Sequence, residues 1–441
     1  MKVLLIGDRE RSSGIKKVLA GSAIFSEPAC SLDAVRKKIR RKDIACAIFD
    51  SDAGVSCGLP TRAKILQLLR GSRKRYIFVT SDTGREIIRE AKAMNASDIM
   101  FRPYSEREFI MRVNACCFAK TKISCIGGGT GLFNLLTAIK SMPGTLITSI
   151  VSMTDDGGST GRLRETFGAL PPGDVRMSLV ALSGAPDLMN RVLQYRFKTG
   201  GECFAGHNIG NIVLVALSEI SGSMKEGVKN LGDILTIRGI VTPVTATNAV
   251  LNAAFDDGTV VRGETNIDLG EGRSPDVHIK RLWHEPETDC SDEAYAAVLF
   301  SDAVILGPGD LYTSVITNLL VRGMKEAIAV TDARKIYMCN LMTKPGETAH
   351  FSACDHVEEI IKYLGGDHLD HVVVSDTVLS REALERYAEK GQVKIEAGDL
   401  RKMRKITRAA IVMADVGHET ELIRHDSDKT RKVIEKILGA K

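Results

Sequence analysis

A ten-residue segment in the first half of the chain concentrates side chains that bind ribose, phosphate and metal ions. It runs Asp155-Asp156-Gly157-Gly158-Ser159-Thr160-Gly161-Arg162-Leu163-Arg164, with two acids, three glycines, two hydroxyls and two arginines. Carboxylates accept ribose hydroxyls or hold cations, and arginines pair with phosphate through parallel hydrogen bonds. An ordinary polar loop is the alternative explanation. The density of these residue types favours a ligand-binding loop.

A run of glycines precedes this segment, Gly127-Gly128-Gly129-Thr130-Gly131, between strand-like KISCI and helix-like LFNLLTAIKSM. Glycines at such a turn let the backbone approach a phosphate, whose charge meets the free amides of the helix N-terminus. Asp155 follows 24 residues after Gly131, near the distance at which an acid holds ribose in dinucleotide sites. Leu132 takes the last position of G-x-G-x-x-G, so a merely tight turn is the alternative.

Further polar strings follow along the chain: Pro171-Pro172-Gly173-Asp174-Val175-Arg176, Gly206-His207-Asn208-Ile209-Gly210-Asn211 and Gly307-Pro308-Gly309-Asp310. His207 fits either a core or capping histidine or the wall of a site. The last string follows the strand-like AVIL, and a helix is predicted to begin near Leu311-Tyr312-Thr313. Two strand-to-helix glycine turns in one sheet would place two helix ends at its carboxyl edge, where ligands of open α/β sheets bind.

The elements that must position these residues alternate between apolar strands and amphipathic helices. Residues 1–118 show this pattern from VLLIG onward, and a second start follows at residue 121. Such alternation predicts parallel sheets covered by helices on both faces. The chain length of 441 residues suggests about three domains at roughly 150 residues each. The pattern reduces this to two, residues 1–118 and residues 121–441.

The composition excludes several classes of protein. The net charge is only +5, with 44% hydrophobic and 26% charged residues, which excludes a disordered chain, a fibre and a strongly basic nucleic-acid binder. No apolar stretch approaches the ~18 residues of a membrane helix. The ten cysteines show no C-x-x-C pair, which is typical of reduced thiols. We expect a cytoplasmic protein with no nucleic-acid partner and no membrane insertion.

The first unit resembles a response-regulator receiver domain, which has a flavodoxin-like fold. Asp50 ends the third strand pattern as the phosphoacceptor would, Thr80 ends the next, and Arg102-Pro103 stands where Lys-Pro is usual. The usual acidic pair after the first strand is Gly7-Asp8 here, and arginine is not equivalent to a lysine point charge. These departures favour a degenerate receiver used for docking or dimerisation, with a working phosphoacceptor at Asp50 as the alternative.

The second unit resembles the YvcK-type gluconeogenesis factors, in the superfamily of the 2-phospho-L-lactate transferase CofD. The strings GGGTG, DDGGSTGRLR, PPGDVR, GHNIGN, GPGDLYTS and NLMTKPGET carry the resemblance in order. It implies a Rossmann-like doubly wound parallel sheet and binding of UDP-sugars such as UDP-N-acetylglucosamine. It also implies a role in carbon partitioning, gluconeogenic growth and cell shape. The transferase relatives use magnesium, whereas ligand binding alone requires no cofactor.

The resemblance also implies a set of ligand-binding residues: Gly127, Gly128, Gly129, Thr130, Gly131, Asp155, Asp156, Gly157, Gly158, Ser159, Arg162, Arg164, Asp174, Arg176, His207, Asn208, Asn211, Gly307, Gly309, Tyr312 and Thr313. If the protein is an enzyme, Asp155, Asp156 and Asp174 are the catalytic candidates; metal ligands are unassigned. Asp310 departs from the family's usual serine and Lys344 from a common glutamine, while Thr317 replaces a proline. A carboxylate at Asp310 would repel phosphate unless a cation bridges them, so it is either a helix cap or faces hydroxyls.

We therefore expect a UDP-sugar-binding regulator without turnover, whose ligand state a protein partner reads and which can form a homo-oligomer. The alternative is a CofD-like transferase that uses a nucleotide-activated donor and magnesium. An NAD-dependent dehydrogenase is a third reading, but the sequence offers no evident hydride-transfer residues.

Overall fold

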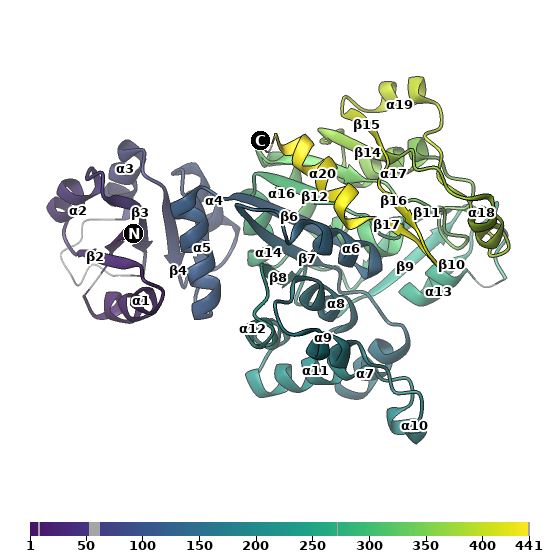
Figure 1. The fold of residues 1–441 in the computed structure, drawn as a ribbon, viewed down its shortest axis with the longest axis horizontal. Coiled ribbons are helices and arrows are strands. Elements are labelled where there is room, and N and C mark those ends of the chain that lie inside the picture. The colour runs from purple at the N-terminus through teal and green to yellow at the C-terminus, as the bar shows by residue number, and fades with distance from the viewer. Residues whose placement is uncertain (8, 53–61, 271, 440–441) are drawn as a thin grey trace. The chain divides into compact units, whose positions relative to one another are not determined.

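The computed structural model describes residues 1–7, 9–52, 62–270 and 272–439 (Figure 1). The chain divides into two compact units. The first contains residues 1–122 with two short later segments, 144–146 and 295–300, and the second contains the rest.

The first unit is built on one five-stranded sheet in the order β2-β1-β3-β4-β5, with parallel neighbours. This is the flavodoxin-like strand order, as the receiver resemblance predicted. Its strands are β1 (Lys2–Ile6), β2 (Phe25–Ala29), β3 (Ile44–Asp50), β4 (Tyr76–Thr80) and β5 (Asp98–Phe101). Its helices are α1 (Arg9–Gly21), α2 (Leu32–Ile39), α3 (Arg62–Ser72), α4 (Arg85–Ala93) and α5 (Glu106–Phe118).

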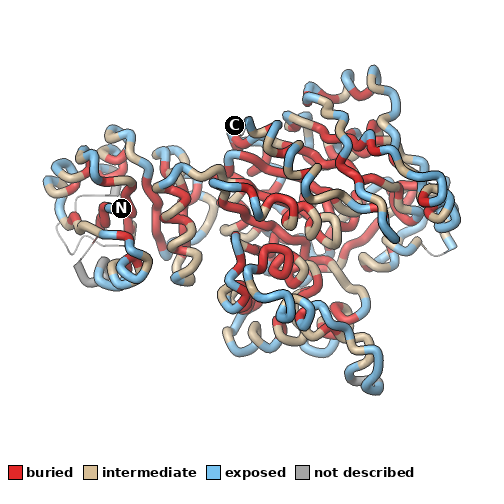
Figure 2. The backbone as a smooth tube through the Cα atoms, in the orientation of Figure 1, coloured by how far each residue is buried: buried red, intermediate tan, exposed pale blue. Residues whose placement is uncertain are grey.

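The burial of these strands on both faces explains why their sequences are continuous apolar runs. Every residue of β4 is buried, and buried segments run through the interior of this unit (Figure 2). Val3, Ile48 and Ile77 of neighbouring strands join one core with Phe109 of α5. A strand covered on both faces has no solvent face for polar residues to occupy.

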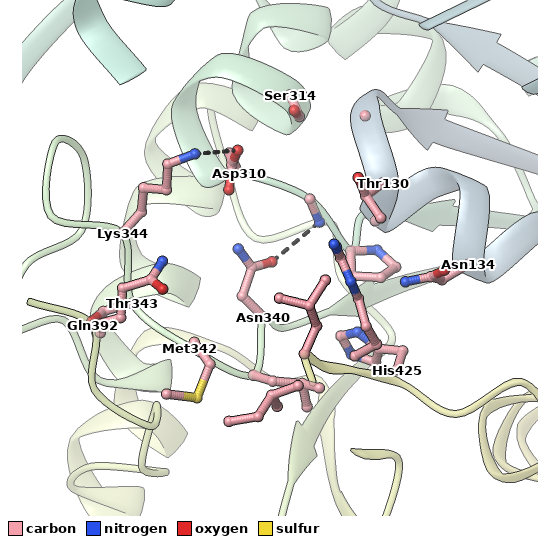
Figure 3. A pocket seen from close by; sticks show the side chains of 18 of the residues that line it. Thr130, Asn134, Asp310, Ser314, Asn340, Met342, Thr343, Lys344, Gln392 and His425 are labelled. Carbon is pink, nitrogen blue, oxygen red and sulfur yellow. Dashed lines mark hydrogen bonds and ion pairs between the residues drawn. The ribbon is translucent and has the colours of Figure 1, made fainter. Parts of the chain in front are cut away.

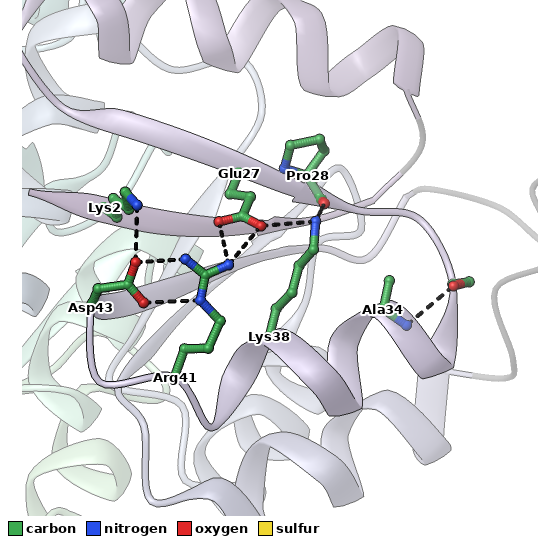
Figure 4. Close-up of polar contacts among 8 residues, drawn as sticks. Lys2, Glu27, Pro28, Ala34, Lys38, Arg41 and Asp43 are labelled. Atoms are coloured by element: carbon green, nitrogen blue, oxygen red, sulfur yellow. Dashed lines mark hydrogen bonds and ion pairs between the residues drawn. The ribbon is translucent and has the colours of Figure 1, made fainter.

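Charged side chains join the edge of this sheet (Figure 4). The carboxylate of Asp43 lies 3.0 Å from Lys2 Nζ and 2.6 Å from Arg41 Nη2. Arg41 also reaches Glu27 at 2.9 Å, so β1, β2 and the segment before β3 share one network. Hydrogen bonds from Arg41 and Lys2 hold the pKa of Asp43 below its usual range. Solvent weakens such pairs, so the network contributes little to stability.

The second unit is built on a seven-stranded sheet in the order β15-β14-β13-β12-β6-β7-β8. Its strands are β6 (Thr121–Gly127), β7 (Thr145–Val151), β8 (Ile240–Pro243), β12 (Ala303–Leu306), β13 (Arg334–Met338), β14 (His371–Ser375) and β15 (Ala410–Ala414). An antiparallel sheet, in the order β10-β9-β11, and one hairpin accompany it. They are formed by β9 (Val250–Phe255), β10 (Val260–Arg262), β11 (Ile279–Glu285), β16 (Gly417–Glu419) and β17 (Ile423–His425).

Helices of the chain after residue 122 are α6 (Gly129–Ile139), α7 (Gly158–Phe167), α8 (Gly173–Leu182), α9 (Asp187–Gln194), α10 (Gly201–Phe204), α11 (Ile209–Ser221), α12 (Met224–Ile234), α13 (Glu264–Leu269), α14 (Asp292–Leu299), the π-helical turn η2 (Leu311–Ile316), α15 (Thr317–Leu319), α16 (Met324–Val330), α17 (Ala353–Leu364), α18 (Arg381–Ala388), α19 (Leu400–Ile406) and α20 (Ser427–Leu438). Across the described residues, no helix has the length and apolar character needed to span a membrane.

The strand order of the second unit fixes where a ligand can enter. β6 lies inside the sheet, and the chain continues to β7 on one side of it and later reaches β12 on the other. Where the strand order reverses, the connections leave the sheet in opposite directions and open a crevice at the carboxyl ends of the strands. The predicted Rossmann-like parallel architecture is confirmed, and it directs attention to the ends of β6 and β12.

Candidate ligand-binding site

The two glycine turns predicted from the sequence touch each other at the carboxyl ends of β6 and β12. A Cβ atom on Gly131 would lie 2.3 Å from the carbonyl oxygen of Pro308, so any side chain would separate the turns. A Cβ atom on Gly128 would lie 2.3 Å from Asp174 Oδ2. Glycine is therefore required at Gly131, whose neighbour is backbone, whereas a side chain at Gly128 would have to displace the Asp174 carboxylate.

A cavity of about 350 Å³ opens beside these turns (Figure 3). Both turns contribute to its wall, together with the loop after β13, Tyr387 of α18, Gln392 beyond it and the hairpin strand β17. The lining residues are Gly128, Gly129, Thr130, Gly131, Asn134, Pro308, Gly309, Asp310, Ser314, Asn340, Leu341, Met342, Thr343, Lys344, Tyr387, Gln392, Leu422, Ile423, Arg424 and His425. We call it the β17 cavity.

A second cavity, of about 320 Å³, shares Thr130 and Asn134 with the first. Its lining combines apolar side chains, amides and two arginines: Thr130, Phe133, Asn134, Arg176, Met177, Val180, Gln194, Arg196 and Asn208. We call it the α8 cavity. The first turn of α6 therefore borders both cavities.

The N-terminus of α6 is open to a ligand. No side chain caps it, and the amides of Thr130 and Gly131 have no hydrogen-bond partner within the described part of the chain. The amide of Gly129 is used internally, since it donates to the Asp174 carboxylate. Unpaired amides at a helix start favour an anionic group.

Asp174 and Asp155 form an acidic pair behind this turn. Asp174 Oδ2 accepts a hydrogen bond from Ser152 Oγ at 2.9 Å, and Asp155 Oδ1 accepts one from the Gly157 amide at 2.9 Å. Burial, followed by the charge of Asp155, raises the pKa of Asp174 to about 6. Burial likewise raises the pKa of Asp155. A carboxylate with such a pKa can accept and release a proton near neutral pH.

A second acidic group borders the β17 cavity. Carboxylate oxygens of Asp268, Asp310 and Glu347 lie within 4.8 Å of one another. Lys344 Nζ lies 2.6 Å from Asp268 Oδ1 and 3.0 Å from Asp310 Oδ2. Burial, followed by the charges of Asp310 and Asp268, raises the pKa of Glu347 to about 8, so Glu347 is largely protonated at neutral pH.

Three clustered carboxylates are the oxygen ligands that magnesium prefers. The Lys344 ammonium already contacts two of them, however, and supplies the compensating positive charge. With Lys344 in this place, the group does not fit a magnesium ion.

The acids of the DDGG segment have separate partners. Asp156 accepts hydrogen bonds from the amides of Glu264 and Thr265, at 3.0 and 2.8 Å, and so caps the first turn of α13. Asp155 instead turns toward Gly157 and the Asp174 side. The structure thus places Asp155, but not Asp156, beside the α6 turn.

The two arginines of this segment hold backbone in place. Arg162 Nη2 donates to the carbonyl oxygen of Ala205 at 2.8 Å. Arg164 donates to the carbonyl oxygen of Asp155 at 2.8 Å and to Asn248 Oδ1 at 2.6 Å. Both were predicted as ligand contacts, yet neither lines the β17 or the α8 cavity.

The GHNIGN string meets the DDGG segment through Ser159. Its Oγ lies 3.2 Å from His207 Nδ1 and accepts the amide of Asn208 at 3.2 Å. Asn211 Nδ2 reaches the same oxygen at 3.3 Å, and Arg176 Nε donates to Asn211 Oδ1 at 2.8 Å. This network orients Arg176 and Asn208 at the wall of the α8 cavity.

At the second glycine turn, Gly309 lines the β17 cavity, and Gly307 stands with φ at +71°, a conformation suited to glycine. Tyr312 and Thr313, also predicted as ligand contacts, are buried. The Thr313 hydroxyl donates to Glu347 at 2.5 Å, and the Tyr312 amide donates to the same carboxylate at 2.8 Å. The structure does not place these two side chains at the cavity.

Several cavity residues were missed by the predicted site: Phe133, Asn134, Met177, Gln194, Arg196, Asn340, Gln392, Arg424 and His425. Asn134 lies one turn beyond the glycine run and was within reach of sequence reasoning. Arg424 and His425 come from β17, whose sequence carries no motif.

In the first unit, Asp50 is buried at the end of β3. Its Oδ2 accepts a hydrogen bond from Arg102 Nη2 at 2.7 Å, and Arg102 Nε lies 3.3 Å from Asp52 Oδ2. The arginine predicted to depart from the receiver pattern therefore neutralises the candidate phosphoacceptor. Asp8 lies outside the described residues.

The fold and this site define a Rossmann-like α/β protein with cavities at the switch point of its parallel sheet. Residues 123–416 match the family model described as 2-phospho-L-lactate transferase CofD. The chain belongs to the CofD family, in the branch that contains the gluconeogenesis factors.

Relatives support this placement. A putative gluconeogenesis factor from Thermotoga maritima is 42% identical over 318 residues, 72% of this chain and 99% of the relative. The gluconeogenesis factor of Bacillus subtilis is 36% identical over 321 residues, 72% of this chain and 98% of its own. A crystal structure of a UPF0052 family protein from Bacillus halodurans has a TM-score of 0.67 at 36% identity, over 71% of this chain and 99% of that one.

Proposed function

We propose that the second unit binds a UDP-sugar of the UDP-N-acetylglucosamine kind and acts, without turnover, as a cytoplasmic regulator of carbon partitioning, gluconeogenic growth and cell shape. The observation that carries this proposal is the pair of cavities that meet at the open N-terminus of α6. The names of the relatives, gluconeogenesis factors, support the physiological part.

A nucleotide-sugar has two uncharged ends joined by a diphosphate, and the two cavities offer matching surroundings. Thr130, whose amide is unpaired, lines both cavities, and Gly131, with the other unpaired amide, lines the β17 cavity, which suits a diphosphate between them. Phe133, Met177 and Val180 give the α8 cavity an apolar wall for a planar base. The β17 cavity is richer in hydrogen-bonding side chains, which suits a sugar.

A regulatory role follows if ligand occupancy changes a surface that a protein partner reads. The β17 cavity is lined by the hairpin strand β17 and by residues beside α18 as well as by the glycine turns. A ligand that contacts all of these elements would favour the arrangement in which they are close together. The partner surface could lie on a second copy of the chain or on another protein.

The alternative function is a 2-phospho-L-lactate transferase-like reaction with a nucleotide-activated donor and magnesium. The pKa of about 6 at Asp174 favours it, because such a group can act as a general base beside the α6 turn. Asp155 and Asp174 would be the residues to hold the magnesium ion, which would supply positive charge for the phosphates of the donor.

A thermal-shift panel with UDP-N-acetylglucosamine, UDP-glucose, GDP plus magnesium, and NAD tests both functions. A ligand at a hundredfold excess over its dissociation constant stabilises the protein by about 2.7 kcal/mol. We expect this response to a UDP-sugar, with the ligand recovered intact after incubation. Stabilisation by GDP plus magnesium alone would contradict the proposal and favour the transferase.

A further inference from the structure

Asp310 occupies the capping position of η2 but does not cap it. Its side chain makes no hydrogen bond to the amides of that turn. Glu347 does so instead, with its Oε2 at 2.8 Å from the Tyr312 amide and 3.4 Å from the Thr313 amide. The Asp310 carboxylate therefore does not stabilise the helix start. Its side chain is 36% exposed and lines the β17 cavity.

Asp310 forms an ion pair with Lys344, which lines the same cavity. Lys344 Nζ gives one hydrogen bond to Asp310 Oδ2 at 3.0 Å and lies 2.6 Å from Asp268 Oδ1. An ammonium has three donors, so the described contacts leave one donor for a ligand. Asp310 likewise retains lone pairs beyond those that face Lys344.

The charge balance shows which ligand group suits this corner. Asp268 and Asp310 contribute two negative charges against the single positive charge of Lys344, while Glu347 is largely protonated. A phosphate here would meet net negative charge and be disfavoured. Hydroxyl groups would be favoured, because they donate to the carboxylate and accept from the ammonium.

We propose that Asp310 and Lys344 form a specificity-determining pair that reads the hydroxyl groups of the ligand's glycosyl moiety. The diphosphate then lies on the α6 side of the cavity. Figure 3 shows Asp310 and Lys344 on the side of the cavity away from Thr130 and Asn134. Asn340 and Gln392 also line this cavity and add amide groups that suit the sugar. This inference rests on the proposed function, since it assigns one part of the same ligand.

The experiment compares the affinities of UDP-N-acetylglucosamine and UDP by isothermal titration calorimetry. Asp310→Asn removes the charge while keeping the shape, and Lys344→Met removes the ammonium. We expect each variant to bind UDP-N-acetylglucosamine at least 10-fold more weakly, because a buried polar contact to the sugar is left unpaired. Binding of UDP alone should change by less than about 3-fold.

Matched variants keep the result interpretable. Glu385→Gln breaks an exposed i,i+4 pair with Arg381 in α18 and should leave both affinities unchanged. The Asp310→Asn, Lys344→Met double variant keeps the net charge of the corner and guards against misfolding caused by one unpaired charge. It should discriminate between the two ligands as poorly as the single variants do.

Two outcomes would overturn the inference while leaving the proposed function intact. One is a Lys344→Met variant that loses affinity equally for UDP and UDP-N-acetylglucosamine, since Lys344 would then bind the diphosphate. The other is a set of variants with unchanged discrimination. If the wild-type protein binds neither ligand, the proposed function and the inference fall together.

Discussion

In each of the two units one basic side chain forms ion pairs with two carboxylates. The two carboxylates of the second unit are more exposed than those of the first. In the first unit Arg102 contacts both Asp50 and Asp52, whose side chains are 4% and 12% exposed. In the second unit Lys344 contacts Asp268 and Asp310, which are 22% and 36% exposed, and Asp310 lines the β17 cavity. The same charge arrangement is thus largely buried in the first unit, where we call it the sealed pair, and partly exposed in the second unit, where we call it the open site.

The type of cation explains part of this difference. Arginine presents several donors in a rigid plane and can satisfy two carboxylates at once. Lysine is a point charge on a flexible stem, and it keeps a donor for a third partner. The first pair therefore suits a fixed structural contact, whereas the second suits recognition of a ligand.

The largest effect is expected from closing the open site, with Gly131→Val. The added Cβ would lie 2.3 Å from the Pro308 carbonyl oxygen, so the two glycine turns must separate. We expect loss of UDP-sugar binding by more than 100-fold and a destabilisation of about 2 kcal/mol or more, typical of overpacking. Calorimetric titration and urea unfolding measure these two quantities.

The control is Gly71→Ala in α3, where an added Cβ meets nothing within 4 Å. Alanine in place of a helical glycine should leave binding unchanged and stability equal or slightly higher. Retained binding in Gly131→Val would show that the open site does not lie at the touching turns.

The second prediction concerns pH, because the two units should respond in opposite directions. In the folded state the pKa of Glu347 is about 8, above its ordinary value near 4.5, so the native state binds the proton more tightly. Its contribution to stability is therefore present below pH 4.5 and is lost as the pH rises through 8. The slope is at most about 1.4 kcal/mol per pH unit for one proton.

In the first unit, burial opposes hydrogen bonds from Ser81 and the charge of Arg102, and the net pKa of Asp52 is lowered. That contribution is present above pH 3.8 and is lost as the pH falls through the folded value. Hydrogen exchange of the full chain at pH 3, 6 and 8 would follow η2 and β3 separately. Glu347→Gln should flatten the response of η2 only, and parallel responses of both regions would contradict the comparison.

The open site was partly predictable from the sequence because its turns are built from local signals. A buried strand, a glycine run and an amphipathic helix specify a backbone turn without reference to the rest of the fold, and both such turns line the β17 cavity. The hydrogen-bond partners of the individual side chains were less predictable. Asp156 caps α13, which begins 108 residues later, and no local sequence pattern predicts that contact.

Arg424 was missed for the same reason, since it reaches the cavity from a hairpin strand that only the tertiary fold brings there. The Asp310–Lys344 pair shows the opposite case. Both residues stood out as departures from the family pattern, and in the structure Lys344 Nζ lies 3.0 Å from Asp310 Oδ2. Whether Asp310 serves as a cap could be decided only by the position of Glu347.

The smallest effect is expected at the sealed pair. Incubation of the full chain with acetyl phosphate and magnesium should leave its mass unchanged, because Arg102 Nη2 already holds Asp50 Oδ2 at 2.7 Å and Asp50 is 3% exposed. To attack acetyl phosphate, the Asp50 carboxylate must first lose its contact with Arg102. A magnesium ion must then bind Asp50 in place of the guanidinium. Intact mass spectrometry measures the result, with Asp50→Asn as the control. A gain of one phosphate that Asp50→Asn abolishes would show that the first unit is a working receiver and that its carboxylate pair is as accessible as the one in the second unit.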